Sequence, residues 1–211
     1  MPLFVKHNVA VLYIHVPKTG GSSIEHFFEQ NGFHCEFRDA GPGFCFNEYR
    51  HCSPQHMHAE HLRTAIRLSR VTYIFMTVRH PMSRLLSEFK TRVRDDGKPY
   101  KLASWVDRIF RNYIEDPFTI DNHIRPQSEF WIPGCDVFRQ ERGFGPALLA
   151  RLEERAGPIF PHRTIGHGNT GPDMGIAEAE IDQIRPAVRQ FYRQDFLTFG
   201  YKPVPGGVDQ G

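Results

Sequence analysis

Residues 9–28, VAVLYIHVPKTGGSSIEHFF, join a strand, a glycine turn and a helix without a gap, and this constrains the fold most. The run 9–16 is rich in β-branched and aromatic residues, which is typical of a strand. Ile24, Phe27 and Phe28 then recur at helical spacing. The segment therefore predicts a strand that passes through a tight turn directly into a helix.

The turn itself has the composition of an anion-binding loop. Gly20 and Gly21 let the backbone approach a ligand closely, while Ser22 and Ser23 can cap the new helix and present hydroxyl groups. Unpaired amide groups and the positive end of the helix would face a bound anion. We therefore expect a phosphate site here. The alternative is a glycine-rich turn without a ligand.

The order of residues excludes two common phosphate loops. Nucleoside triphosphatases place Lys after the glycines, in G-x-x-x-x-G-K-[ST], whereas Lys18 precedes them. The dinucleotide pattern G-x-G-x-x-G is also missing from this turn. The remaining pattern, P-K-T-G-G-S-S after a strand, resembles the 5′-phosphosulfate loop of sulfotransferases that use 3′-phosphoadenosine 5′-phosphosulfate (PAPS). It is most similar to carbohydrate O-sulfotransferases and their short soluble bacterial relatives.

Residues 71–90, VTYIFMTVRHPMSRLLSEFK, repeat the organisation: a strand-forming run leads to Arg79, and Pro81 opens a helix. The apolar stripe of that helix places Ser83, Arg84 and Ser87 largely on its other faces. In the resembling family, the pattern R-x-P-x-x-R-x-x-S supplies an Arg and a Ser that bind the 3′-phosphate of the donor. The matching positions are Arg79 and Ser87. Arg79 could instead pair with a carboxylate.

The resemblance also implies roles for the first loop. Lys18 would neutralise charge on the leaving nucleotide, and the amides and hydroxyls of the turn would hold the 5′-phosphate. The residues concerned are Lys18, Thr19, Gly20, Gly21, Ser22 and Ser23.

Four of the twelve histidines lie in residues 51–61, HCSPQHMHAEH. Sulfuryl transfer to a hydroxyl requires a base, and His titrates near neutral pH. In the resembling enzymes, a His begins a segment that ends in Leu or Phe between the two donor motifs. The stretch from His56 to Leu62 matches it. The resemblance therefore implies His56 as the catalytic base, with His58 in reserve. Histidines on a helix surface are the alternative.

A zinc site is a second reading of this stretch. His56, His58 and His61, with Cys52 or Cys45, offer nitrogen and sulfur ligands. Their spacing fits no finger pattern. On one helix, the first two imidazoles would point about 200° apart, given 3.6 residues per turn. We therefore expect no metal.

Two later segments extend the resemblance. DNHIRPQSEFW (121–131) resembles an H-x-R-P-Q-x-x-[FY] segment of the bacterial relatives that borders the acceptor and donor pocket. Arg125 and Gln127 are its candidates for substrate binding, unless they only order the loop. TIGHGNTGP (164–172) matches a late donor-contacting loop, which implies His167 and Asn169.

Strands that alternate with helices predict an α/β protein with a P-loop-like, three-layer fold, in which helices flank a central parallel sheet. With 40% hydrophobic residues, the 211 residues suit one sulfotransferase-like domain over 1–211. The sequence also predicts one further short strand and several further helices. The strand covers 135–141, and the helices cover 56–68, 101–114, 146–157 and 176–199, the last broken near Pro186.

Charge and cysteine usage limit partners and compartment. A net charge of +2 is too balanced to indicate nucleic-acid binding. The four cysteines lack C-x-x-C pairing, and neither a signal peptide nor an apolar run of about 20 residues is visible. We therefore expect a cytoplasmic protein without a membrane span. The Golgi relatives carry a membrane anchor, so their substrates and compartment do not transfer.

The sequence thus favours an enzyme that moves a sulfuryl group from PAPS, as co-substrate, to a hydroxyl acceptor, for which we expect a carbohydrate. Two alternatives stay open. One is a P-loop-type nucleoside-phosphate kinase or hydrolase, and the other is a non-catalytic nucleotide- or glycan-binding protein.

Overall fold

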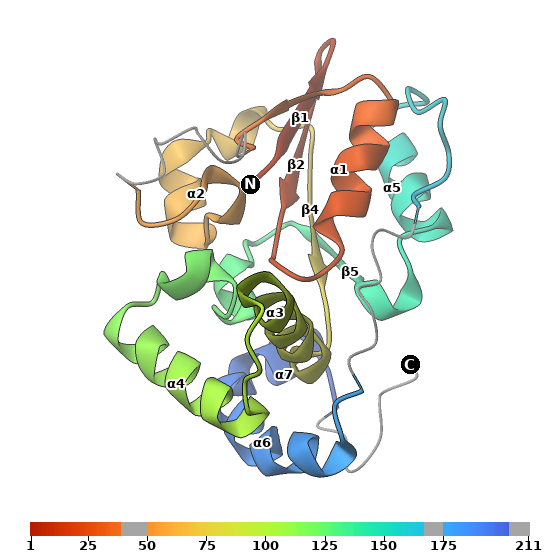
Figure 1. Cartoon of the computed structure of the whole chain (residues 1–211). Helices are drawn as coiled ribbons and strands as arrows, with labels where there is room; N and C mark the ends of the chain where they lie inside the picture. Colours follow the sequence, from red (N-terminus) through yellow and green to blue (C-terminus); the bar gives the residue numbers. More distant parts are fainter. Residues whose placement is uncertain (39–49, 167–174, 203–211) are drawn as a thin grey trace.

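The computed structural model describes residues 1–38, 50–166 and 175–202. Within these residues, a five-stranded sheet has the strand order β3-β1-β2-β4-β5 (Figure 1). The central strands β2, β4 and β5 run parallel, whereas β1 pairs antiparallel with both β2 and β3. The strands are β1 Leu3–Lys6, β2 Val9–Ile14, β3 His34–Glu36, β4 Tyr73–Val78 and β5 Asp136–Arg139.

The predicted all-parallel sheet is therefore wrong in one part, because the sheet is mixed. The cause lies at its start, where only His7 and Asn8 connect β1 to β2. A two-residue connection can join only antiparallel strands. His7 adopts a positive φ of 52°, as such a turn requires. The three strands that lead toward the predicted site are parallel, as expected.

Helices cover both faces of the sheet, which agrees with the predicted layers. The alternation along β2 explains this, because Val11 and Tyr13 pack into one core and Leu12 and Ile14 into the other. The first core lies under α1 and α5, and the second under α3, α4, α6 and α7 (Figure 1). The helices are α1 Gly21–Gln30, α2 Ala59–Ala65, α3 Pro81–Asp96, α4 Leu102–Glu115, α5 Pro146–Ala156, α6 Glu178–Phe191 and α7 Arg193–Phe199.

Two helix boundaries differ from expectation. The helix predicted from residue 56 begins only at Ala59, because Pro54–His56 form a separate 3-10 turn. The C-terminal helices break at Tyr192 and not at Pro186, which lies inside α6. Tyr192 is fully buried and donates its hydroxyl hydrogen to the carbonyl of Ile124, so tertiary contacts fix the bend there.

Candidate active site

The two predicted donor motifs meet at one edge of the sheet. Because β2 and β4 are parallel neighbours, with Ile14 opposite Met76, their carboxyl ends lie side by side. Arg79 follows β4, and its Nη1 donates a hydrogen bond of 3.4 Å to the carbonyl of Lys18. The structure thus brings together the two positions expected to bind the two phosphates of one nucleotide.

Hydrogen bonds from a buried side chain hold the first loop in place. The hydroxyl of Thr19 is fully buried, donates to the carbonyl of Val16 at 2.7 Å and lies 2.7 Å from the hydroxyl of Thr77. Thr19 therefore anchors the loop with its side chain, which leaves only its amide for an anion. Ser22 is exposed and Ser23 is buried on the first turn of α1. No side-chain hydrogen bond caps this helix, and its first turn carries no acid.

Both glycines of the loop are required by its geometry. Gly20 has a φ of 92°, and a Cβ there would lie 2.6 Å from the ring of Phe144. A Cβ on Gly21 would lie 2.0 Å from Nε2 of His15. The ring of His15 therefore rests directly on the loop.

Positive charge gathers around the loop without full neutralisation. The Lys18 ammonium donates to the hydroxyl of Thr91 at 2.6 Å, and that hydroxyl in turn donates to the carbonyl of Ser87. Burial lowers the pKa of Lys18, and the charges of Arg94, Arg79 and Arg92 lower it further while Glu88 opposes them. Ser87 thus lies one helical turn from the hydroxyl that holds the lysine.

Arg79 has an unsatisfied donor. Its Nε is buried and makes no hydrogen bond, and burial lowers the pKa of its guanidinium. An unpaired guanidinium donor at a strand end is costly unless a ligand accepts from it. Among the described residues, Lys18, Arg79 and the amides of the loop are therefore suited to hold an anionic nucleotide.

His56 lies in a buried network on the other side of this edge. Its Nδ1 is 2.7 Å from Oδ2 of Asp121 and 3.2 Å from the hydroxyl of Ser53. The hydrogen bonds to His56 and Ser53 hold the pKa of Asp121 down, at about 2, although burial raises it. Because an ionised carboxylate can only accept, Nδ1 of His56 carries the proton and Nε2 is left as the acceptor.

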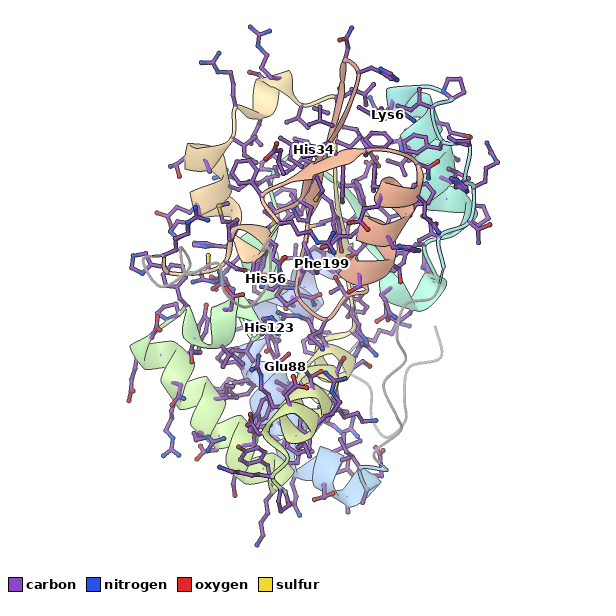
Figure 2. The ribbon with its side chains drawn as sticks, turned by 45° about the horizontal axis from the view of Figure 1, so that its top comes forward. Lys6, His34, His56, Glu88, His123 and Phe199 are labelled. Atoms are coloured by element: carbon purple, nitrogen blue, oxygen red, sulfur yellow. The ribbon has the colours of Figure 1, made fainter. Side chains whose placement is uncertain are left out.

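Two further acid–imidazole pairs flank this one. Nδ1 of His15 lies 3.0 Å from Glu25, and Nδ1 of His123 lies 2.7 Å from Glu88. The ring of His56 contacts both neighbouring imidazoles edge-on, at centroid distances of 5.2 Å and 4.8 Å. Figure 2 shows His56, His123 and Glu88 one after another. Because His15 rests on Gly21, this histidine chain, formed by His15, His56 and His123, begins at the predicted phosphate loop.

The reserve candidate, His58, lies in different surroundings. Its ring packs against those of His61 and Phe118, at 4.6 Å and 5.7 Å, and its Nδ1 is buried without a hydrogen bond. Burial lowers the pKa of His58 to about 4. The structure thus joins His56 to the loop and directs His58 toward an aromatic cluster.

The zinc set that was considered as an alternative, His56, His58 and His61 with a cysteine, does not form one group of ligand atoms among the described residues. The described residues contain a different group of possible ligands, formed by His56, Asp121 and His123. One ligand atom from each of these residues lies within 4.8 Å of the other two. Nδ1 of His56 already shares its hydrogen with Asp121. Cys45 lies outside the described residues.

Arg125 and Gln127 make internal contacts. Gln127 is fully buried, accepts from the amide of Arg79 at 2.9 Å and donates to its carbonyl at 2.8 Å. Arg125 donates to Asn122 at 2.8 Å and to the carbonyl of Pro117 at 3.1 Å. These contacts order the segment that carries Asp121, and direct binding to an acceptor stays a prediction. His167 and Asn169 lie outside the described residues.

Arg84, expected on a polar face of α3, is buried instead. Its guanidinium donates to the carbonyls of Pro17, Arg125 and His123, at 3.0, 2.9 and 2.7 Å. These hydrogen bonds link the predicted phosphate loop to the segment after Asp121.

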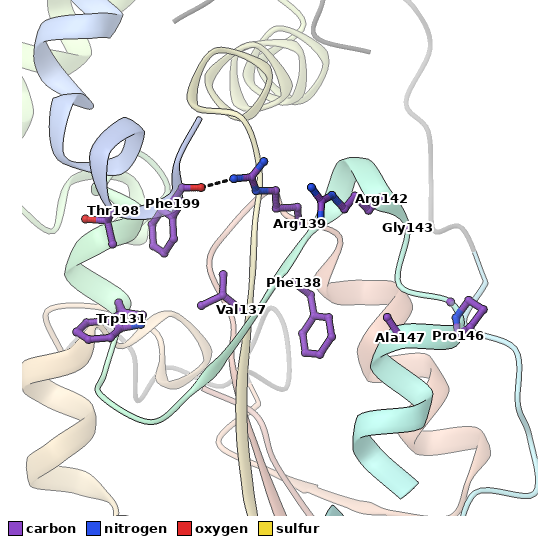
Figure 3. Close-up of a pocket in the computed structure, with 11 residues that line it drawn as sticks. Trp131, Val137, Phe138, Arg139, Arg142, Gly143, Pro146, Ala147, Thr198 and Phe199 are labelled. Atoms are coloured by element: carbon purple, nitrogen blue, oxygen red, sulfur yellow. Dashed lines mark hydrogen bonds between the residues drawn. The ribbon is translucent and has the colours of Figure 1, made fainter. Parts of the chain in front are cut away.

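A pocket in the described part of the chain lies away from these predicted residues. It has a volume of about 510 Å³ and borders β5, the start of α5 and the end of α7 (Figure 3). Arg139, which lines it, donates to the carbonyl of Phe199. Its lining includes none of the predicted site residues, although Phe144, next to Gly143 and Gly145 of this lining, packs against Gly20.

Comparison with protein families identifies the family to which this chain belongs. A family model described as "Sulfotransferase family" matches residues 1–202. The chain belongs to the sulfotransferase family. Its members transfer sulfuryl groups, and this chemistry is consistent with a candidate site that combines cations with a buried histidine. No curated protein and no solved structure matches the chain. None of the described helices of this sulfotransferase is long and apolar enough to cross a membrane.

Sequence reasoning missed several residues of the site. His15, Glu25 and Glu88 looked like ordinary strand-end or helix residues, and only the packing pairs them. His123 was visible, because it is the first residue of the H-x-R-P-Q segment. Asp121 lies two residues before it and carried no signal in the sequence.

Proposed function

We propose that this sulfotransferase moves a sulfuryl group from PAPS to a hydroxyl group of a carbohydrate. The unpaired donor of Arg79 next to Lys18 carries the proposal. A nucleotide with both a 5′-phosphosulfate and a 3′-phosphate offers anionic oxygens at its two ends. Lys18 and the loop Thr19, Gly20, Gly21, Ser22 and Ser23 would bind the first end. Arg79 and Ser87 would bind the second, because a guanidinium offers paired, permanently charged donors to a phosphate.

His56 serves as the general base in this proposal. The acceptor oxygen attacks sulfur while Nε2 of His56 takes up its proton, and the bond from sulfur to the bridging oxygen of the 5′-phosphate breaks. The leaving group is 3′,5′-ADP, whose new negative charge Lys18 and the loop amides stabilise. Atoms and charge balance without a further reactant.

Support for the base comes from the protonation state of His56. Burial lowers the pKa of His56 to about 3, although the hydrogen bond to Asp121 opposes this. The imidazole is therefore neutral at neutral pH, and the lone pair of Nε2 is unprotonated. The contact of His15 with both Gly21 and His56 joins this base to the donor loop.

A thermal-shift comparison of 3′,5′-ADP with 5′-AMP and ATP tests the donor. We expect the largest rise in Tm with 3′,5′-ADP, and Arg79→Ala should remove its advantage over 5′-AMP. Arg111→Ala, an exposed arginine of α4 that pairs with Asp107, is the control and should keep that advantage. Equal shifts with all three nucleotides, or a magnesium-dependent preference for ATP, would refute the proposal.

A further inference from the structure

Three consecutive residues beside His56 adopt an uncommon backbone conformation. Ile120, Asp121 and Asn122 have φ angles of 44°, 56° and 62°, all in the left-handed region. This region is uncommon for residues other than glycine, and a β-branched residue such as Ile is a marked outlier there. Such a run persists only where its surroundings hold it, and runs of this kind gather at functional sites.

The contacts that hold this left-handed turn converge on His56. The Asp121 carboxylate accepts from the amide of Ser53 at 2.6 Å, from its hydroxyl at 2.7 Å and from Nδ1 of His56 at 2.7 Å. Asn122 donates from Nδ2 to the carbonyl of His56 at 2.8 Å. Arg125 in turn fixes the Asn122 side chain at 2.8 Å. The turn therefore grips both the ring and the main chain of His56.

We propose that Asp121 is a positioning residue that keeps the proton on Nδ1 of His56 and the lone pair on Nε2. The role in sulfuryl transfer rests on the proposed function, whereas the tautomer is a property of the resting protein. A base must present its lone pair to the acceptor hydroxyl, and only the Nδ1–H tautomer does so at Nε2.

The hydrogen-bond donors around Asp121 predict the effect of a single substitution on the tautomer of His56. In Asp121→Asn, the amide hydrogen of Ser53 is fixed by the main chain and requires the oxygen of the new side chain at the Oδ1 position. The NH2 group must then face His56, where it can only donate. Nδ1 would have to accept, so the proton would move to Nε2 and block the base. Asn tolerates left-handed backbone better than most residues, so the turn itself should persist.

Other groups around the ring do not replace Asp121. His15 and His123 face the imidazole, each with Nδ1 next to its own carboxylate, Glu25 or Glu88. Their charges oppose protonation of His56, whereas the bond to Asp121 favours it. Asp121 is therefore the one acid that contacts this imidazole among the described residues.

Nitrogen-15 NMR of the full chain tests the tautomer, with His56→Ala to assign the signal. Wild type should show the Nδ1–H form and Asp121→Asn the Nε2–H form. Asp116→Asn, an exposed acid of the same segment, is the matched control and should keep the wild-type form. An unchanged His56 signal in Asp121→Asn would overturn the inference.

Kinetics separate this inference from the proposed function. With radiolabelled PAPS and a panel of hexoses, uronic-acid oligosaccharides and phenols, Asp121→Asn should lower kcat by about 100-fold or more. The KM for PAPS and the affinity for 3′,5′-ADP should stay near wild type. If Asp121→Asn switches the tautomer but wild type transfers no sulfuryl group, the positioning of the proton by Asp121 is supported and the proposed function is refuted. Transfer by wild type with an unreduced kcat in Asp121→Asn would sink the positioning role.

Discussion

His56 and His58 lie two residues apart in one short stretch but have different neighbours. His56 contacts a carboxylate and two further imidazoles, in a chain that starts at the phosphate loop. His58 packs on His61 and Phe118 and has no carboxylate on its Nδ1. Both are buried, with 6% of each residue exposed, so burial alone does not distinguish them. The two imidazoles therefore differ in the partner on Nδ1, and this difference is why we propose His56 and not His58 as the base.

The largest expected effect separates these two histidines. His56→Ala should lower the rate of sulfuryl transfer by about 100-fold or more, since it removes the general base. His58→Ala should leave the rate nearly unchanged, because its ring lies in the aromatic cluster. Transfer of radiolabel from PAPS measures both, and binding of 3′,5′-ADP by each variant serves as the control for folding. A greater loss in His58→Ala than in His56→Ala would reverse the assignment.

A smaller effect is expected where the histidine chain meets the loop. Gly21→Ala places a Cβ where the ring of His15 now lies, so this ring must move away from the loop. Overpacking of this kind should destabilise the fold by about 1 to 3 kcal/mol and weaken the binding of 3′,5′-ADP. Urea unfolding and isothermal titration calorimetry measure the two effects.

Ser104→Ala is the control for this substitution, since it changes a solvent-exposed position of α4. It should leave both stability and nucleotide binding close to wild type. If Gly21→Ala leaves stability and nucleotide binding as unchanged as this control does, the contact between His15 and the loop contributes to neither.

The smallest effect is a dependence of stability on pH. Burial lowers the pKa of His56 to about 3 and that of His58 to about 4, from an ordinary value of 6.5. Below pH 6.5, the unfolded chain therefore binds protons that the folded chain excludes, so stability falls as the pH falls. The shifted carboxyl groups of Asp121 and Glu88 lose their contribution only below their ordinary values of 3.8 and 4.5.

Between pH 6.5 and 5, a falling Tm should thus report mainly on buried histidines. Substitution of either one, as His56→Gln or His58→Gln, should flatten the slope of Tm against pH in this window. Differential scanning fluorimetry measures the slope. A wild-type Tm that does not change across the window would contradict the burial of these rings as neutral groups.

Much of the frame of the site follows from sequence, because strand ends and helix starts are local properties. The β-branched runs before Lys18 and Arg79 predicted two parallel strands, and their neighbouring pairing placed the two cations together. The β1–β2 hairpin was missed, since the run before His7 is only four residues long. Short strands depend on pairing with the sheet more than on their own composition.

The surroundings of the base could not be predicted in the same way. Asp121 reaches His56 across 65 positions of sequence, and Glu88 reaches His123 across 35. Such pairs depend on how the segments pack, which local patterns do not encode. Arg84 was misplaced for the same reason, because three carbonyls from distant segments make its burial possible. A helical periodicity alone assigns an arginine to solvent.

The amide of Gln127 closes hydrogen bonds with both main-chain groups of Arg79, as a neighbouring strand would do. One side chain thereby joins the cation proposed to bind the nucleotide to the segment proposed to position the imidazole of His56. Arg84 provides a second link, because its guanidinium donates to the carbonyl of Pro17 and to carbonyls of the segment after Asp121, so both parts of the candidate site are joined by hydrogen bonds. The two reactants would therefore have to fit a distance that the protein has already set.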